Sequence, residues 1–106
     1  MSGYGDFGAR KNFPAFDNII QAETGFMHLT GSKDQAYKMG FAITDVLTAL
    51  YASNAILAGI IHRQQTNQGI HLKTSLYECA ISSLINQSSN YLNGRVNPGR
   101  LGILFQ

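Results

Sequence analysis

The stretch from Phe41 to Thr66 constrains the fold of this chain most strongly, because its apolar pattern is long and almost uninterrupted. No charged residue occurs between Val46 and Ile61, where the polar groups are three hydroxyls and one amide. A helix that is apolar nearly all round is typical of a protein interior. The pattern therefore predicts a long, buried helix with a carboxylate, Asp45, at its leading end.

One side of this predicted helix carries mostly small residues. Helical spacing places the following residues on one face: Asp45, Ala49, Ala52, Ile56 and Gly59. Small side chains let a neighbouring backbone come close, so we expect a tightly packed partner segment on this face.

A membrane span is the alternative interpretation of the same stretch. The charge-free run from Val46 to Ile61 falls short of the roughly 18 to 20 residues that cross a bilayer. It also contains hydroxyl and amide groups, which are costly in hydrocarbon. We therefore expect a buried helix and no membrane span.

The composition points to a protein that uses a partner surface. With 106 residues the chain forms at most one modest domain, and its 44% hydrophobic content is ordinary. Charged residues make up 13%, about half the usual share, so little polar side chain is available to cover an isolated surface. The net charge of +2 comes from eight scattered basic residues, a pattern that does not indicate nucleic-acid binding.

The cysteine and histidine residues give no metal or disulfide signature. The single cysteine, Cys79, excludes an intrachain disulfide, suits a reducing compartment and lies in a helical apolar pattern, which predicts a buried structural thiol. The histidines, His28, His62 and His71, are far apart and lack other ligands at metal-binding spacing. The first residues show no targeting signal, and we expect an intracellular protein, cytoplasmic or mitochondrial.

The N-terminal part predicts a loop followed by a short helix. Glycines at positions 3, 5 and 8 favour a tight turn and do not complete a phosphate-binding motif. Asp17 stands where an N-cap would precede a helix that Gly25 ends. The polar stretch 30–38 should be a surface loop.

The flanks of the long helix carry further signals. An N-cap role for Thr44 or Asp45 would contribute roughly 1 kcal/mol relative to alanine. After the long helix, residues 70–74 alternate apolar and polar as a half-buried strand does. Ser75 then opens a last helix that ends at Gly94, and the apolar residues 103–105 resemble an interrupted element.

Four motifs occur in a characteristic order and at characteristic distances: SGYG, FDNIIQAETGFMHLTG, ITDVLTALYASNAILAGIIHR and QGIHLKTSLYE. Up to about Leu101, the chain resembles the class III CoA-transferases of the formyl-CoA transferase and CaiB/BaiF type, which are several times longer. The resemblance implies an α/β fold, in which residues 1–106 are a central segment of one incomplete domain. This segment would belong to the Rossmann-like part of an interlocked homodimer, mostly helical with short strands.

The resemblance also implies a reaction. These enzymes move coenzyme A from an acyl-CoA to a carboxylic acid without a metal or a permanently bound cofactor. The aspartate that opens the buried helix is the nucleophile, and it corresponds to Asp45 here. Its carboxylate would attack the thioester and then carry CoA as an aspartyl-CoA thioester.

The resemblance implies roles for other residues as well. Asp17 matches an acidic position that would help to place the reacting groups, and the SGYG loop would line the CoA site through backbone amides: Ser2, Gly3, Tyr4 and Gly5. The chain departs from the family where GQTGP usually follows this loop, because Asp6 stands in that segment. A negative charge there is expected to weaken the contact with an anionic ligand.

Two alternatives remain. A 2-methylacyl-CoA racemase of the same fold needs a histidine immediately before the first helix aspartate, where this chain has Phe16, which cannot act as an acid or base. The other alternative is an inactive truncated paralogue, since the family's nucleotide-binding part and a downstream glycine loop would lie outside these residues. On that interpretation the 106-residue chain alone would bind CoA poorly and turn over little.

Overall fold

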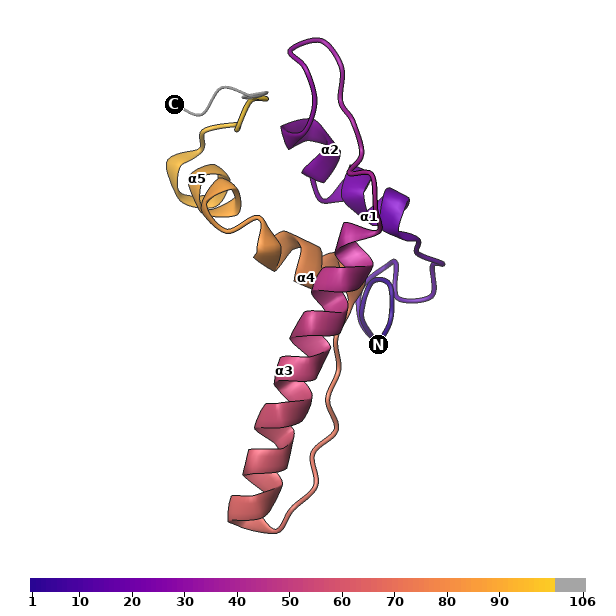
Figure 1. Cartoon of the computed structure of the whole chain (residues 1–106), viewed down its shortest axis with the longest axis vertical. Helices are drawn as coiled ribbons and strands as arrows, with labels where there is room; N and C mark the ends of the chain where they lie inside the picture. Colours follow the sequence, from indigo (N-terminus) through magenta and orange to yellow (C-terminus); the bar gives the residue numbers. More distant parts are fainter. Residues whose placement is uncertain (101–106) are drawn as a thin grey trace.

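The computed structural model describes residues 1–100, and residues 101–106, including the apolar positions 103–105, lie outside this part. The described chain is helical: α1 (Asp17–Glu23), α2 (Phe26–Leu29), α3 (Ile43–Thr66), α4 (Leu76–Ser83) and α5 (Asn86–Gly94). Figure 1 shows α3 as a long arm that leaves the cluster formed by the other helices. The mostly helical character expected from the sequence is confirmed.

The core lies where α1, α4 and the first turns of α3 meet. Its apolar members are Ile20, Cys79 and Ala80, and the buried polar residues around them are Gln21, Thr24, Thr44, Thr48 and Ser75. Every buried side-chain nitrogen or oxygen within residues 1–100 has a hydrogen-bond partner. A core of this composition depends on satisfied hydrogen bonds as well as on apolar contact, because an unpaired buried polar group costs about 1 to 3 kcal/mol.

The predicted burial of α3 is wrong for this chain. Within α3 the buried residues are Thr44 and Thr48, both near its start. Large apolar side chains of α3 are exposed, Val46 already within its first turns and the others farther along: Leu50, Tyr51, Ile56, Leu57, Ile60 and Ile61. The physical reason is geometric, since α1 and α4 reach only the beginning of a 24-residue helix.

The close approach predicted for the small-residue face is confirmed at Gly59. Residues 67–75 run back along α3, and a Cβ atom at Gly59 would lie 3.2 Å from side-chain carbons of both Ile70 and Leu72. A larger residue at this position would push the returning segment away from the helix.

By length and apolar composition alone, α3 meets the criteria for a membrane-crossing helix. The core helix of a soluble protein meets the same criteria, so this finding is weak evidence for a span. Within the described chain, 11% of the apolar window is buried.

The predicted strand at residues 70–74 is absent, and the part of the chain that the structure covers contains no strand. One parallel bridge joins Ser2 to Ser75. The alternating segment is extended, but a strand requires a hydrogen-bonded partner along its length and this one has a partner at one end. The α/β class stays a prediction for the larger fold.

Three predicted helix boundaries also need correction. Asp17 is the first residue of α1, and Phe16 takes the N-cap position without a side-chain hydrogen bond. Thr44 and Asp45 lie inside the first turn of α3, after the N-cap Ala42. The predicted last helix is broken between α4 and α5, where Ile85 adopts a left-handed φ of 47° that a continuous helix does not permit.

Other local predictions are confirmed. The loop from 32 to 38 is exposed, and Gly25 adopts a left-handed φ of 94° between α1 and α2. Ser75 is the N-cap of α4: its hydroxyl accepts from the amide of Glu78 at 3.3 Å and donates to the carboxylate of Glu78 at 2.5 Å. This pairing is a variant of the capping box.

We expect Ser75→Ala to lower the free energy of unfolding by about 1 kcal/mol, because it removes the cap of α4 and the partner of the Glu78 carboxylate. Thermal unfolding followed by circular dichroism measures the change. Ser75→Thr keeps the hydroxyl and is the control. Equal melting temperatures for Ser75→Ala and the parent protein would contradict the assigned cap.

Candidate functional site

The glycine-containing loop Ser2–Gly5 lies against the N-terminus of α4. The amides of Leu76 and Tyr77 donate to the carbonyls of Ser2 and Gly3, each at 3.0 Å. The loop therefore satisfies two amides at the start of α4 that have no partner within the helix. The bridge to Ser75 continues this contact, since the amide of Ser2 donates to the carbonyl of Thr74 at 3.0 Å.

Two of the four loop amides are already engaged. Besides Ser2, the amide of Gly5 donates to the Ser2 hydroxyl at 3.0 Å. Within residues 1–100 the structure records no acceptor for the amides of Gly3 and Tyr4. Position 3 also requires glycine, because a Cβ there would lie 2.3 Å from the Cβ of Ala15. The backbone amides of Gly3 and Tyr4 are therefore available to bind a ligand, whereas those of Ser2 and Gly5 already donate to other groups.

Tyr4 is held between an aromatic ring and a cation. Its ring centroid is 5.8 Å from that of Tyr77, and the guanidinium carbon of Arg10 lies 5.7 Å from the Tyr4 ring centroid. Arg10 in turn forms an ion pair with Glu23 of α1. Burial, and then the neighbouring Glu23 carboxylate, raises the pKa of the Tyr4 hydroxyl, so this group is neutral at physiological pH.

The charge of Asp6 is offset by a lysine. The Lys73 ammonium lies 2.5 Å from an Asp6 carboxylate oxygen, and its hydrogen bond lowers the pKa of Asp6. Both side chains line an open hollow of about 380 Å³ beside the loop, together with Ser2, Gly5 and Glu78. The repulsion expected between Asp6 and an anionic ligand is therefore reduced by an adjacent cation.

Asp17 caps the long helix from a different helix. The amide of Thr44 donates to Asp17 Oδ1 at 2.9 Å, and the Thr44 hydroxyl donates to the same oxygen at 2.8 Å. A carboxylate that accepts from the first turn of a helix satisfies an otherwise unpaired amide and interacts favourably with the helix dipole. The local N-cap, Ala42, makes no such bond.

Asp45 follows Thr44 directly and lies in the first turn of α3. It is exposed, and within the described residues its carboxylate has no hydrogen bond or ion pair to another side chain. The structure thus brings Asp17 to the residue that precedes Asp45. The loop Ser2–Gly5 is connected to the same core through α4, which packs on α3.

Gln21 belongs to this cluster and was not found from the sequence pattern. It is fully buried, donates to Asp17 Oδ2 at 2.7 Å and accepts from the amide of Met39 at 2.8 Å. The available signal was its position four residues after Asp17, on the same face of α1 and beside the buried Ile20. Glutamine is mostly exposed in helices, so this signal alone does not indicate burial.

Cys79 is buried and free, as predicted. Burial raises the pKa of its thiol, which keeps it protonated and unreactive at neutral pH. Its place in the core of α4 supports a structural role.

The chain matches the sequence profile of CoA-transferase family III over residues 1–104. The chain belongs to CoA-transferase family III. It is 37% identical over 103 residues to the succinate–glutarate CoA-transferase of Agrobacterium fabrum, covering 96% of this chain and 26% of that protein. It is 34% identical over 103 residues to the succinyl-CoA:glutarate CoA-transferase of Mus musculus, covering 96% of this chain and 24% of that one.

The fold of this family III chain is also similar to a solved structure. A CaiB/BaiF family protein from Brucella suis matches it with a TM-score of 0.89 and 36% sequence identity, over 93% of this chain and 26% of that one. The chain thus spans about a quarter of the length of the relatives it matches.

We expect Asp17→Ala to speed hydrogen exchange of the Thr44 amide roughly fivefold, because loss of a cap costs about 1 kcal/mol. Asp17→Asn can keep the oxygen that accepts from Thr44 and should have a smaller effect, through loss of the charge and of the hydrogen bond from Gln21. Amide exchange measured by NMR checks both. Unchanged exchange at Thr44 in Asp17→Ala would show that α3 does not depend on this cap.

We expect NMR titration to place the pKa of Asp6 below the ordinary value of 3.8, and Lys73→Gln to return it toward that value. Because the folded pKa is the lower one, the ion pair stabilises the fold above the unfolded-state pKa and loses this effect as the pH falls through the folded pKa. Lys11→Gln removes another exposed lysine and is the control. An identical Asp6 titration in Lys73→Gln would disprove the pairing.

Proposed function

We propose that this chain supplies the nucleophile of a CoA-transferase, and that Asp45 is that nucleophile. The observation that carries the proposal is the position of Asp45: an exposed carboxylate in the first turn of a 24-residue helix whose start is capped by Asp17. The relatives are named CoA-transferases, which agrees with this assignment.

The physical state of Asp45 suits this role. The N-terminus of a helix carries a partial positive charge, which interacts favourably with a carboxylate in the first turn. Its neighbour Thr44 already pairs with Asp17, so the carboxylate of Asp45 is not used to cap the helix. A carboxylate that is exposed and unpaired among the described residues can approach the carbonyl carbon of a thioester.

The proposed reaction has four balanced steps. The Asp45 carboxylate attacks the thioester carbonyl, which releases CoA thiolate and leaves a mixed anhydride. The thiolate attacks the Asp45 carbonyl of this anhydride, giving aspartyl-CoA thioester and the free acid of the donor. The acceptor carboxylate then attacks the aspartyl thioester and forms a second anhydride, and the released thiolate attacks its acyl carbonyl, giving the new acyl-CoA and free Asp45.

The loop Ser2–Gly5 is proposed to lie along the CoA molecule. The amides of Gly3 and Tyr4 would donate to its anionic or carbonyl oxygens, and Lys73 would offset the negative charge of Asp6 at the adjoining hollow. Asp17 is a positioning residue in this proposal, since it contacts the helix start rather than the substrate.

The substrate class follows from the relatives. Two of them are named for succinate or succinyl-CoA and glutarate. We therefore propose that the donor is the CoA thioester of a dicarboxylic acid and that the acceptor is a second dicarboxylic acid.

We also propose that the exposed apolar side of α3 is covered by further chain in an assembled homodimer.

The racemase alternative is less favoured, because Phe16 is the N-cap of α1 and provides no group for proton transfer.

We expect Asp45→Ala to lower kcat on the order of 10⁴-fold or more, because it removes the attacking group. The protein is expressed from its complete reading frame and assayed with succinyl-CoA and glutarate. With the parent protein, hydroxylamine should trap the thioester as a hydroxamate on the Asp45 peptide, detected by mass spectrometry.

The matched control is Asp34→Ala, which removes an exposed carboxylate from the surface loop before α3 and should leave kcat unchanged. Full activity in Asp45→Ala, or a hydroxamate on another peptide, would refute the assignment of the nucleophile.

A further inference from the structure

The amide of Gln21 connects α1 to the segment that leads into α3. Its Nε2 donates to Asp17 Oδ2 at 2.7 Å and to the carbonyl of Phe41 at 3.4 Å, while its Oε1 accepts from the amide of Met39 at 2.8 Å. The side chain is 0% exposed. Both ends of the amide are therefore used, and every contact lies at the entrance to α3 or at its cap.

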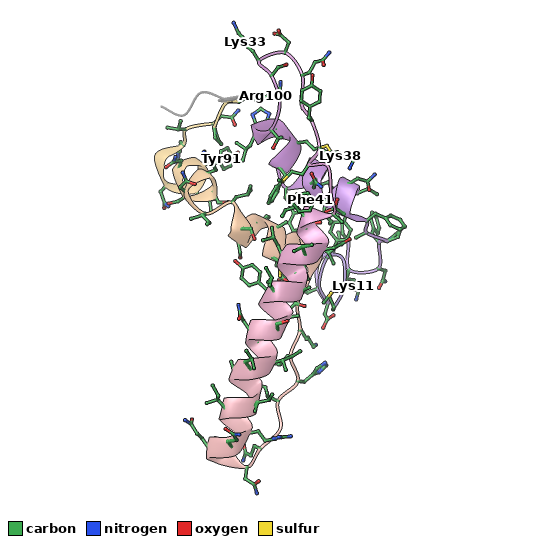
Figure 2. The ribbon with its side chains drawn as sticks, in the orientation of Figure 1. Lys11, Lys33, Lys38, Phe41, Tyr91 and Arg100 are labelled. Carbon is green, nitrogen blue, oxygen red and sulfur yellow. The ribbon has the colours of Figure 1, made fainter. Side chains whose placement is uncertain are left out.

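The segment held by Gln21 has little other support. Lys38, Gly40 and Phe41 are exposed, and a Cβ at Gly40 would meet no atom within 4 Å. Figure 2 shows Lys38 and Phe41 where the incoming chain turns into α3 beside α1. Met39 is half-buried, and the amide of Ile43 donates to the Phe41 carbonyl at 2.8 Å. Among the hydrogen bonds of the described residues, those of Gln21 are the ones that join this turn to α1.

Gln21 also orients the cap. One oxygen of the Asp17 carboxylate accepts from Gln21 and the other accepts twice from Thr44. Asp45 is the next residue of α3 and moves with Thr44 as part of a rigid helical turn. Consequently α1 holds the helix start through its cap and through the chain that precedes it.

We propose that Gln21 is a positioning residue for the Asp45 nucleophile, an inference that rests on the function proposed above. It fixes the Met39–Phe41 turn and the Asp17 carboxylate together, and so sets where Asp45 points. It is buried and does not touch the substrate. A shift of about 1 Å in a reacting group can lower a rate on the order of 10²-fold, so this support affects kcat more than binding.

The position requires an amide rather than an acid. With Gln21→Glu, an oxygen would replace Nε2 at 2.7 Å from Asp17 Oδ2. Two carboxylates at this distance do not both stay ionised, and a shared proton restores one hydrogen bond. Other titratable groups on α1 and on the segments that pack against it include Glu23, His28, Lys38, Asp45, Tyr77, Glu78 and Cys79. Among residues 1–100, Asp17 is the titratable residue whose side chain is hydrogen-bonded to the Gln21 amide.

The experiment measures kcat and KM for the protein expressed from its complete reading frame, with succinyl-CoA and glutarate. We expect Gln21→Leu to lower kcat about 10²-fold, with KM for the acyl-CoA changed less than about threefold. For Gln21→Glu, kcat relative to the parent protein at the same pH should rise as the pH is lowered. Hydroxamate formation on Asp45 should fall in parallel with kcat.

Two controls separate positioning from stability. Ile20→Ala removes buried volume from the same helix without touching the hydrogen bonds, so it should lower the melting temperature and retain kcat. Gln87→Glu makes the same amide-to-carboxylate change on α5, and its kcat relative to the parent protein should not depend on pH. If Gln21→Leu does not fold, the pH response of Gln21→Glu alone decides the question within one protein.

The outcomes distinguish the two proposals. An inactive Asp45→Ala together with kcat within about twofold of the parent in Gln21→Leu overturns the role of Gln21 and leaves the nucleophile in place. A loss of kcat in Ile20→Ala equal to that in Gln21→Leu also overturns it. An active Asp45→Ala overturns both.

Discussion

The hydrogen bonds from Thr44 to Asp17 are the constraint on which the rest of the structure depends. A 24-residue helix leaves its first amides without internal partners, and here the missing acceptor comes from α1 rather than from the residue before the helix. This contact joins α1 to α3 and fixes the position of Thr44, the residue directly before Asp45. The helix start is therefore rigid where the proposed chemistry takes place, although α3 as a whole is exposed.

The remainder of α3, in contrast, has few contacts and leaves apolar side chains exposed. Leu50 and Leu57 are 58% and 61% exposed, and complete burial of such a side chain would contribute about 1.5 to 3 kcal/mol. The described chain offers the extended segment 70–72 as cover, which reaches Gly59 but leaves most of the apolar surface open. Low charge content and exposed apolar area together agree with a helix that is stabilised by further protein, as the proposed homodimer would provide.

The candidate site divides into residues that a pattern can indicate and residues that it cannot. Asp45 and Asp17 stand in long motifs, so their positions followed from resemblance, and Cys79 followed from helical periodicity. The burial of Gln21 could not be predicted in this way, because two of its hydrogen bonds join residues 18 and 20 positions apart in sequence. The prediction of a strand at residues 70–74 was wrong for a related reason. Alternation indicates a half-buried surface, but a ladder requires a partner along the whole segment, and within residues 1–100 this segment is paired only at its end, next to Ser2.

The sequence by itself determined the helical stretches, the capping serine of α4, the glycine turns and the family, since each depends on local chemistry or on motif order. The tertiary structure decided that α3 is exposed, that the last helix breaks at Ile85, and that Asp17 caps another helix instead of its own. Those features depend on which segments meet in space. For Phe41 to Thr66, the apolar pattern established the helix, and the reach of its neighbours determined how much of it this chain could cover.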